Sequence, residues 1–147
     1  MEKVVEIRTI KQVKGEVEIP FKKIQDPQSV VDNIYYLIGD EAREVFLVLC
    51  LSTKNEINAI FKAHTGSMNA SLVDPKTVFQ GALLSNSASV IVAHSHPSGD
   101  PSPSREDVDV TNRLVKAGKV VGVQVLDHII VGGNSEKHIS FKERGYM

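Results

Sequence analysis

The sequence has 147 residues, 41% hydrophobic and 24% charged, with 17 basic and 18 acidic residues and a formal net charge of -1. This composition predicts one water-soluble domain and excludes a disordered chain, and the balanced charge argues against a protein that mainly binds nucleic acid phosphates. The single cysteine, Cys50, excludes an internal disulfide, and the absence of a signal-like or membrane-spanning run predicts a cytoplasmic protein.

The first 25 residues are predicted to form an N-terminal extension or a hairpin. Apolar and polar residues alternate in two short runs, at residues 5–8 and 16–19, and Lys14-Gly15 between them is a turn signal. Two edge strands joined by that turn would explain the pattern.

Two helices are predicted from the same start signal, an aspartate followed by a proline. Asp26-Pro27 precedes apolar residues at helical spacing, and Asp74-Pro75 precedes a second stretch that reaches Leu84. The aspartate can cap free backbone amides, and proline at the first helical position has no amide to satisfy. We therefore expect helices that begin at the two prolines.

The longest apolar runs predict buried strands. Residues 44–51 are almost continuously apolar and rich in β-branched and aromatic side chains, which is typical of a central strand covered on both faces. Residues 89–93 form a similar run that leads directly into His94. Further strands are predicted at residues 57–64, 120–126, 129–131 and 138–141.

Residues 96–103 are predicted to form a loop, because their prolines lack the amide donors that a sheet needs. A helix is expected next, with Ser102 as its cap and Pro103 as its first residue, and it reaches about Gly118. The alternation of helices with buried strands predicts an α/β fold, a single domain over residues 1–147 in which helices pack on a mixed sheet.

Four polar residues around this loop have the spacing of a metal site. His94 and His96 are two apart at the end of a strand, so their side chains leave the same face of the sheet. Ser104 and Asp107 are three apart on the following helix and share one helical face. Two imidazoles and one carboxylate form a ligand set of catalytic zinc sites, in which water takes the fourth position. A chain with one cysteine favours such an open site over a closed structural one.

Each half of this pattern also has a simpler interpretation. A His-x-His pair at a strand end is often only two polar residues near a sheet edge. Ser104 and Asp107 also fit a capping box, in which both side chains bond free amides at the start of the helix. Neither pair alone therefore establishes a metal site.

The order H-x-H, x7, S, x2, D, which runs from His94 to Asp107, is more specific than either half. It resembles the signature of the JAB1/MPN (JAMM) zinc metallopeptidases. Residues 94–101 and 126–132 resemble, more narrowly, the RadC branch, a bacterial group labelled as DNA repair proteins. The resemblance covers about residues 27–146.

The resemblance implies a curved mixed sheet flanked by helices, similar to the architecture of the cytidine deaminases. It also implies one zinc ion per chain, held by His94, His96 and Asp107. A nucleobase deaminase itself needs a Pro-Cys-x-x-Cys ligand pair, which a chain with one cysteine excludes.

The resemblance further implies two catalytic side chains. In the wider family, a glutamate at the start of an earlier strand activates the zinc-bound water, and the matching position is Glu44. Glu41 and Glu56 remain alternatives, since spacing alone does not choose among the three. Ser104 is expected to hydrogen-bond the water or the tetrahedral oxyanion.

Two further residues have open roles. Asn69 lies in a short run, residues 66–69, that resembles a RadC loop, so it either lines the cleft or belongs to a simple turn. His128 follows a strand and has Asp127 beside it. It either supports a metal ligand by hydrogen bonding or, as the preferred interpretation, is a core histidine with satisfied hydrogen bonds.

The resulting expectation is a zinc-dependent hydrolase of peptide or isopeptide bonds that acts on a protein or peptide substrate. The alternative is a DNA repair or recombination accessory protein with a structural or vestigial metal site. The balanced charge predicts that any DNA contact is weak or indirect. Longer RadC proteins carry an N-terminal helix-hairpin-helix-like region, and this chain resembles the short form of the family, without room for that region.

Overall fold

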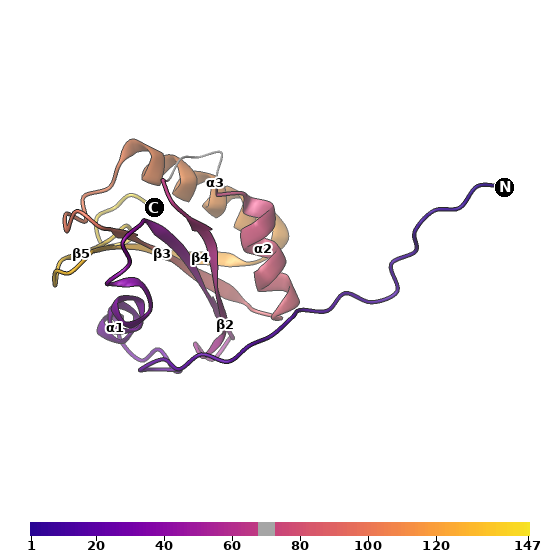
Figure 1. Ribbon diagram of the computed structural model, residues 1–147, viewed down its shortest axis with the longest axis horizontal. Coiled ribbons are helices and arrows are strands. Elements are labelled where there is room, and N and C mark those ends of the chain that lie inside the picture. Colours follow the sequence, from indigo (N-terminus) through magenta and orange to yellow (C-terminus); the bar gives the residue numbers. More distant parts are fainter. Residues whose placement is uncertain (68–72) are drawn as a thin grey trace.

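The computed structural model describes residues 1–67 and 73–147, and within them five strands form one mixed sheet with helices on both faces (Figure 1). This architecture confirms the predicted α/β class. Among the described residues, no helix combines the length and apolarity that crossing a bilayer requires. The elements are α1 (Pro27–Ile38), β1 (Val45–Leu51), β2 (Ile57–Thr65), α2 (Pro75–Leu84), β3 (Ser89–His96), α3 (Arg105–Val121), β4 (Gln124–Gly132) and β5 (His138–Ser140).

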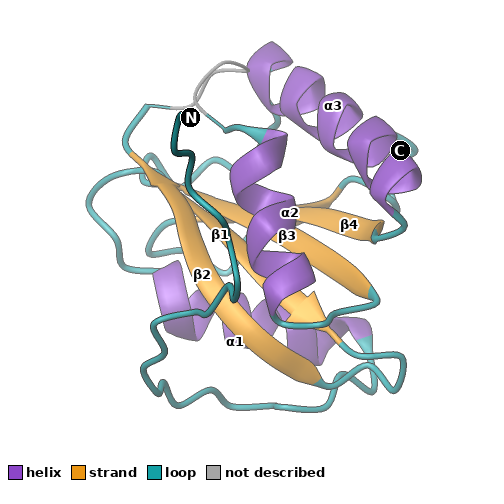
Figure 2. Cartoon of the chain, turned by 90° about the vertical axis from the view of Figure 1, so that its right-hand side faces the viewer, coloured by secondary structure: helices purple, strands orange, loops and turns teal. Residues whose placement is uncertain are grey.

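The sheet has the strand order β2-β1-β3-β4-β5, in which only β3 and β4 run parallel. Helix α1 covers one face, and helices α2 and α3 cover the other (Figure 2). All seven residues of β1 are buried, because alternate side chains enter the two hydrophobic cores on either side of the sheet. The near-continuous apolar run that predicted a central strand is thereby explained.

Helices α1 and α2 begin at the two predicted prolines. The Asp26 side chain accepts a hydrogen bond from the Ser29 amide at 2.8 Å, and Asp74 accepts one from the Lys76 amide at 2.9 Å. Each aspartate thus satisfies one of the amides that a helix start leaves free. In both cases the start signal predicted the correct first residue.

The two strands predicted at residues 5–8 and 16–19 are not formed. Residues 1–20 contain neither helix nor strand and are almost entirely exposed. Their first part runs away from the domain as an extended arm (Figure 1), whereas residues 15–17 line a pocket beside β2 and Ile19 packs against the core. A strand is stabilised by hydrogen bonds to a neighbour, and a hairpin alone is marginal in water. The alternating pattern was therefore an insufficient signal, and the segment is an extension. The first sheet-like contact is an isolated bridge between Lys23 and Glu56.

Helix α3 differs from its prediction at both ends. It begins at Arg105 with Ser104 as the N-cap, two residues later than the predicted Ser102 cap. It continues past Gly118 to Val121 and ends at Gly122, which adopts the left-handed conformation at φ 79°. The valines at the helix end suggested a strand, but they lie on its exposed side. The strands predicted at residues 120–126 and 129–131 are instead one strand, β4.

Strand β4 contains an irregularity that changes which side chains face α3. Val90 pairs with Val125, whereas Ile91 pairs with Asp127, so one extra residue stands in β4 between these pairs. Such a bulge reverses the alternation of side chains beyond it. Val125 and His128 consequently lie on the same face of the sheet, although regular alternation would separate them. This displacement brings His128 next to the predicted metal ligands.

Candidate metal centre

Two histidines project from the carboxyl end of β3 toward the α2 and α3 side of the sheet. Their Nε2 atoms lie 2.8 Å apart, so the rings converge as the spacing predicted. His94 is fully buried, and the His96 side chain is 12% exposed. The pair therefore has one ring inside the protein and one that reaches the surface.

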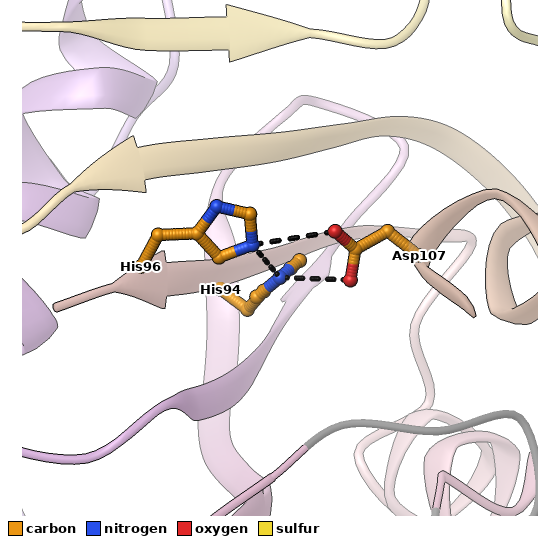
Figure 3. Close-up of side chains that lie close together, drawn as sticks. All are labelled: His94, His96 and Asp107. Atoms are coloured by element: carbon orange, nitrogen blue, oxygen red, sulfur yellow. Dashed lines mark hydrogen bonds and ion pairs between the residues drawn. The ribbon is translucent and has the colours of Figure 1, made fainter. Parts of the chain in front are cut away.

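Asp107 comes to the histidines from the first turn of α3 (Figure 3). Its Oδ1 atom lies 3.0 Å from Nε2 of His94, and its Oδ2 atom lies 3.3 Å from Nε2 of His96. One ligand atom from each residue falls within 4.8 Å of the other two, which is the arrangement of a group that can hold a metal ion. The predicted meeting of a strand end with a helix start is thus present in the structure.

The capping-box interpretation of Ser104 and Asp107 is also confirmed. The Ser104 hydroxyl accepts a hydrogen bond from the Asp107 amide at 3.1 Å, and Asp107 Oδ2 accepts one from the Ser104 amide at 2.7 Å. These reciprocal bonds fix the carboxylate at the helix start. The two interpretations are compatible, because Oδ1 of Asp107 still faces His94.

Hydrogen bonds also set the charge states of the site. Burial raises the pKa of the Asp107 carboxyl, but the neighbouring His94 and His96 imidazoles and the hydrogen bond from the Ser104 amide outweigh burial and hold that pKa well below its usual range. Burial lowers the pKa of His96, but the nearby Asp107 carboxylate and the hydrogen bond to the Asp100 carbonyl outweigh burial. The pKa of His96 is therefore raised. Asp107 is consequently a carboxylate, the form that binds a cation.

The donor set fits a zinc ion, because both histidines can present Nε2 as a ligand atom. Nδ1 of His96 lies 2.9 Å from the Asp100 carbonyl oxygen, which can only accept a hydrogen bond. The proton of a neutral His96 therefore resides on Nδ1, and its Nε2 lone pair faces the other two ligands. Imidazole nitrogens with a carboxylate oxygen are preferred zinc ligands.

A second buried histidine lies behind the site. Nε2 of His128 is 2.9 Å from Nδ1 of His94, and Nδ1 of His128 is 2.5 Å from the Thr111 hydroxyl. Burial, with the nearby His94, lowers the pKa of His128 well below its ordinary value. Phe141 stacks against the His128 ring with centroids 4.4 Å apart, and Phe46 stacks on His94 at 6.1 Å.

Glu44 lies directly before β1, on the edge of the site. Phe46 pairs with His94 in the antiparallel β1–β3 ladder, so continuing the register by two residues sets Glu44 opposite His96 on the same face. The charge of Glu44 contributes to the raised pKa of His96. Its backbone carbonyl accepts a hydrogen bond from the Gly66 amide at 2.7 Å, which ties this position to the end of β2.

The two alternatives to Glu44 lie elsewhere. Glu41 forms an ion pair of 2.9 Å with Lys62. Glu56 precedes β2, whose first residue pairs with Leu51 at the far end of β1 from the histidines. Of the three glutamates, Glu44 is the one that the sheet register places beside the ligand group.

Sequence reasoning missed two contributors to the site, and one candidate residue lies outside the described part of the chain. Thr111 was not predicted, although its position four residues after Asp107 sets both on one helical face and was a usable signal. The Asp100 carbonyl was not predictable, because a backbone contact depends on the loop conformation. Both interpretations of His128 hold, because it is a buried histidine with satisfied hydrogen bonds and it also contacts the predicted ligand His94. The bulge in β4 that turns His128 to this face is not evident in the sequence. Asn69 lies outside the described residues.

The chain is similar to a family of sequences and to several curated proteins. The RadC-like JAB domain family matches residues 24–146, a range that includes all three ligand positions. A UPF0758 protein of Methanosarcina barkeri is 47% identical over 131 residues, which cover 89% of this chain and 56% of the relative. A UPF0758 protein of Clostridium beijerinckii is 41% identical over 140 residues, covering 95% and 58%.

A third relative, a UPF0758 protein of Caldanaerobacter subterraneus, is 45% identical over 123 residues, which cover 84% of this chain and 52% of the relative. The chain therefore spans about half the length of the curated relatives that it matches. The similarity lies in the domain that holds the histidine and aspartate group.

Proposed function

The chain belongs to the RadC-like JAB domain family, and from that membership we propose that it is a zinc-dependent hydrolase of peptide or isopeptide bonds. The observation that carries the proposal is the convergence of His94, His96 and Asp107, whose ligand atoms lie within 4.8 Å of one another. Two imidazoles and one carboxylate leave room for water at a tetrahedral ion. This is the ligand arrangement of hydrolytic zinc sites, whereas structural sites close the fourth position.

His94, His96 and Asp107 are the residues that would hold the ion. When bound, zinc acidifies water and polarises a carbonyl oxygen, which is the chemistry that amide hydrolysis requires. The three side chains supply a fixed, mostly buried cradle for it, because His94 and Asp107 are almost fully buried and His96 opens to solvent. A substrate carbonyl can therefore approach from the side of His96.

Glu44 is proposed as the general base and Ser104 as the oxyanion stabiliser. The Glu44 carboxylate accepts a proton from the attacking water and returns it to the nitrogen of the leaving amine. The Ser104 hydroxyl serves the cap as an acceptor, so its hydrogen remains available to donate to the oxygen of the tetrahedral carbon.

The substrate is proposed to be a protein or peptide, in a cytoplasmic setting. The alternative function, a DNA repair or recombination accessory, makes a different prediction, because binding to a duplex depends on neutralised phosphates and weakens steeply with salt. The net charge of -1 gives no support for strong duplex binding. Tight, salt-sensitive DNA binding combined with no hydrolysis would favour the alternative.

The proposal is tested by replacing the base while keeping the ligands. Zinc-loaded protein is incubated with a peptide library that includes lysine-linked isopeptides, and new termini are detected by mass spectrometry. Glu44→Gln is expected to retain zinc and to lower turnover by about 100-fold or more, because a positioned base contributes about 10²- to 10⁴-fold. Glu41→Gln is the matched control, since Glu41 pairs with Lys62, and it should cleave like the wild type.

Two results would contradict the assignment. Full activity in Glu44→Gln would remove Glu44 from the role of base. A zinc-loaded wild type that cleaves no member of the library would count against a hydrolase of this bond class.

A further inference from the structure

An unbroken chain of hydrogen bonds connects the two ends of the metal centre through the protein interior. Nδ1 of His94 contacts Nε2 of His128 at 2.9 Å, Nδ1 of His128 contacts the Thr111 hydroxyl at 2.5 Å, and that hydroxyl contacts the Asp107 carbonyl oxygen at 2.8 Å. This series of hydrogen bonds therefore starts at the proposed ligand His94 and ends on the backbone of the proposed ligand Asp107. All of its side chains are buried.

The direction of every bond follows from its last member. The Asp107 carbonyl oxygen can only accept, so the single hydroxyl hydrogen of Thr111 points to it. The Thr111 oxygen must then accept from Nδ1–H of His128. A neutral His128 with its proton on Nδ1 has a lone pair on Nε2, and this lone pair accepts from Nδ1–H of His94.

The other directions each leave a buried group unsatisfied or charged. If Thr111 donated to His128, two oxygens would face each other at 2.8 Å with no hydrogen between them. If both nitrogens of His128 carried protons, a fully buried cation would have His94 and Thr111 as its ring partners, and neither is negatively charged. Burying an unpaired charge is strongly unfavourable, because no partner compensates for the lost hydration.

We propose that His128 and Thr111 are positioning residues that hold His94 with its proton on Nδ1 and its Nε2 lone pair directed at the metal site. This inference rests on the proposed zinc function for its purpose, while its hydrogen-bond pattern is a property of the metal-free protein as well. His96 has the same proton position, which the Asp100 carbonyl sets. Both histidines therefore direct Nε2 at the candidate metal site.

Aromatic side chains hold the His128 ring in a fixed orientation. Phe141 stacks on the His128 ring at 4.4 Å between centroids, and Phe46 meets it edge-on at 5.6 Å. The His128 ring is therefore restrained on two sides and cannot turn over without displacing a buried aromatic ring. Thr111 is held on α3, four residues after the ligand Asp107.

The test begins with the proton position on His128. In the wild type, nitrogen chemical shifts of the imidazoles, measured by long-range proton–nitrogen correlation, are expected to show a proton on Nδ1 and a lone pair on Nε2 of His128. Histidine free in water prefers the opposite form, so this result does not arise by default. The measurement is made on metal-free and on zinc-loaded protein.

Variants of Thr111 test the consequence for zinc. Thr111→Val keeps the shape and removes the acceptor, so the proton of His128 should move to Nε2. Zinc affinity should then fall by about 10- to 100-fold, the loss expected when a direct partner of a metal-ligating histidine no longer supports it. Thr111→Ser keeps the hydroxyl and should bind zinc within about threefold of the wild type. Affinity is measured by competition with a chromophoric chelator.

Ser140→Ala is the matched control for loss of a buried hydroxyl. Ser140 donates to Asp127 at 2.6 Å on the neighbouring strand and does not belong to the chain of bonds. Its variant should lose stability in urea as Thr111→Val does, yet retain zinc affinity. If Thr111→Val fails to fold, the proton position in the wild type still decides the question.

The outcomes separate this inference from the proposed function. A wild type that binds zinc but carries the His128 proton on Nε2 would overturn the inference alone, as would wild-type zinc affinity in Thr111→Val. A wild type that binds no zinc but shows the Nδ1 proton would refute the proposed function and support the hydrogen-bond assignment.

Discussion

Asp107 takes part both in the cap of α3 and in the candidate ligand group. One oxygen caps α3 by accepting from the Ser104 amide, and the other faces His94. The cap orients the carboxylate and leaves one oxygen facing His94, so the start of the helix is itself part of the candidate metal centre. Because the two oxygens have different partners, a capping box and a candidate ligand can coincide in one short stretch.

Cys50 gives a prediction at the residue scale that is independent of the site. Burial raises the pKa of its thiol, with weaker opposing hydrogen bonds from Ser85 and Ser87. The folded protein therefore holds a neutral thiol at about pH 7, and the side chain is fully buried. A thiol-reactive disulfide reagent should label Cys50 in urea but not in the native protein, as read by absorbance.

The pH dependence of stability has a definite sign for this residue. Because the pKa is higher in the folded state, the unfolded thiol ionises first, so the free energy of unfolding should fall as pH rises through about 8.5. Cys50→Val lacks this contribution and should show a shallower decline in urea unfolding. Rapid labelling of native protein would contradict the buried neutral thiol.

The residues that the sequence could reveal are those whose spacing alone fixes a shared face. His94 and His96 follow the two-residue period of a strand, and Ser104 and Asp107 follow the turn of a helix. That the two pairs meet was indicated by the combined motif. Thr111 and the face of His128 depend on packing and on the bulge in β4, which local spacing does not encode.

At the scale of elements, the β3–α3–β4 unit brings the ligands together. The two strands are parallel neighbours, and the connecting loop carries the chain from the carboxyl end of β3 to the start of α3. Residues at a strand end and in the first turn of the following helix therefore meet on one edge of the sheet. The loop also contributes the Asp100 carbonyl that orients His96.

Gly132 lets this loop pack closely against the end of β4. A Cβ atom at position 132 would lie 2.2 Å from the Gly99 carbonyl oxygen and 2.6 Å from the Ser135 hydroxyl. Gly132→Ala should therefore cost about 1–3 kcal/mol in urea unfolding, as overpacking does, and should weaken zinc binding by displacing the loop that orients His96.

Gly15→Ala provides the control for this prediction, because no atom lies within 4 Å of a Cβ at position 15. It should leave both the unfolding midpoint and zinc affinity unchanged. Wild-type stability and affinity in Gly132→Ala would show that the loop tolerates the added methyl group and that its close packing is not needed.

Helix starts were predictable where an aspartate-proline pair marks them, but not for α3, where Ser102 and Ser104 were rival caps, nor where tertiary contacts decide. The aspartate-proline pairs located α1 and α2, because capping is a local interaction. Residues 5–8 and 16–19 have the pattern of strands but no hydrogen-bonded neighbour. Val120 and Val121 have strand-like side chains, yet α3 continues through them until Gly122 ends it.

For the whole molecule, each face of the sheet is covered by helices and packs a hydrophobic core (Figure 2). The core on the α1 side includes the buried polar residues Ser29 and Asn33. The core under α2 and α3 continues into the histidine cluster, so the candidate site lies on that face. The described chain corresponds to about half of the length of its curated relatives, so the activities of those longer proteins remain proposals for this domain.

The most direct test of the account is the metal content of the purified protein. After reconstitution with zinc and removal of excess ion, mass spectrometry of the metals should find about one zinc per chain in the wild type and far less in His94→Ala and Asp107→Ala, which remove ligands. His138→Ala, an exposed histidine outside the ligand group, should keep the wild-type content. A metal-free wild type, or full zinc in both ligand variants, would contradict the account.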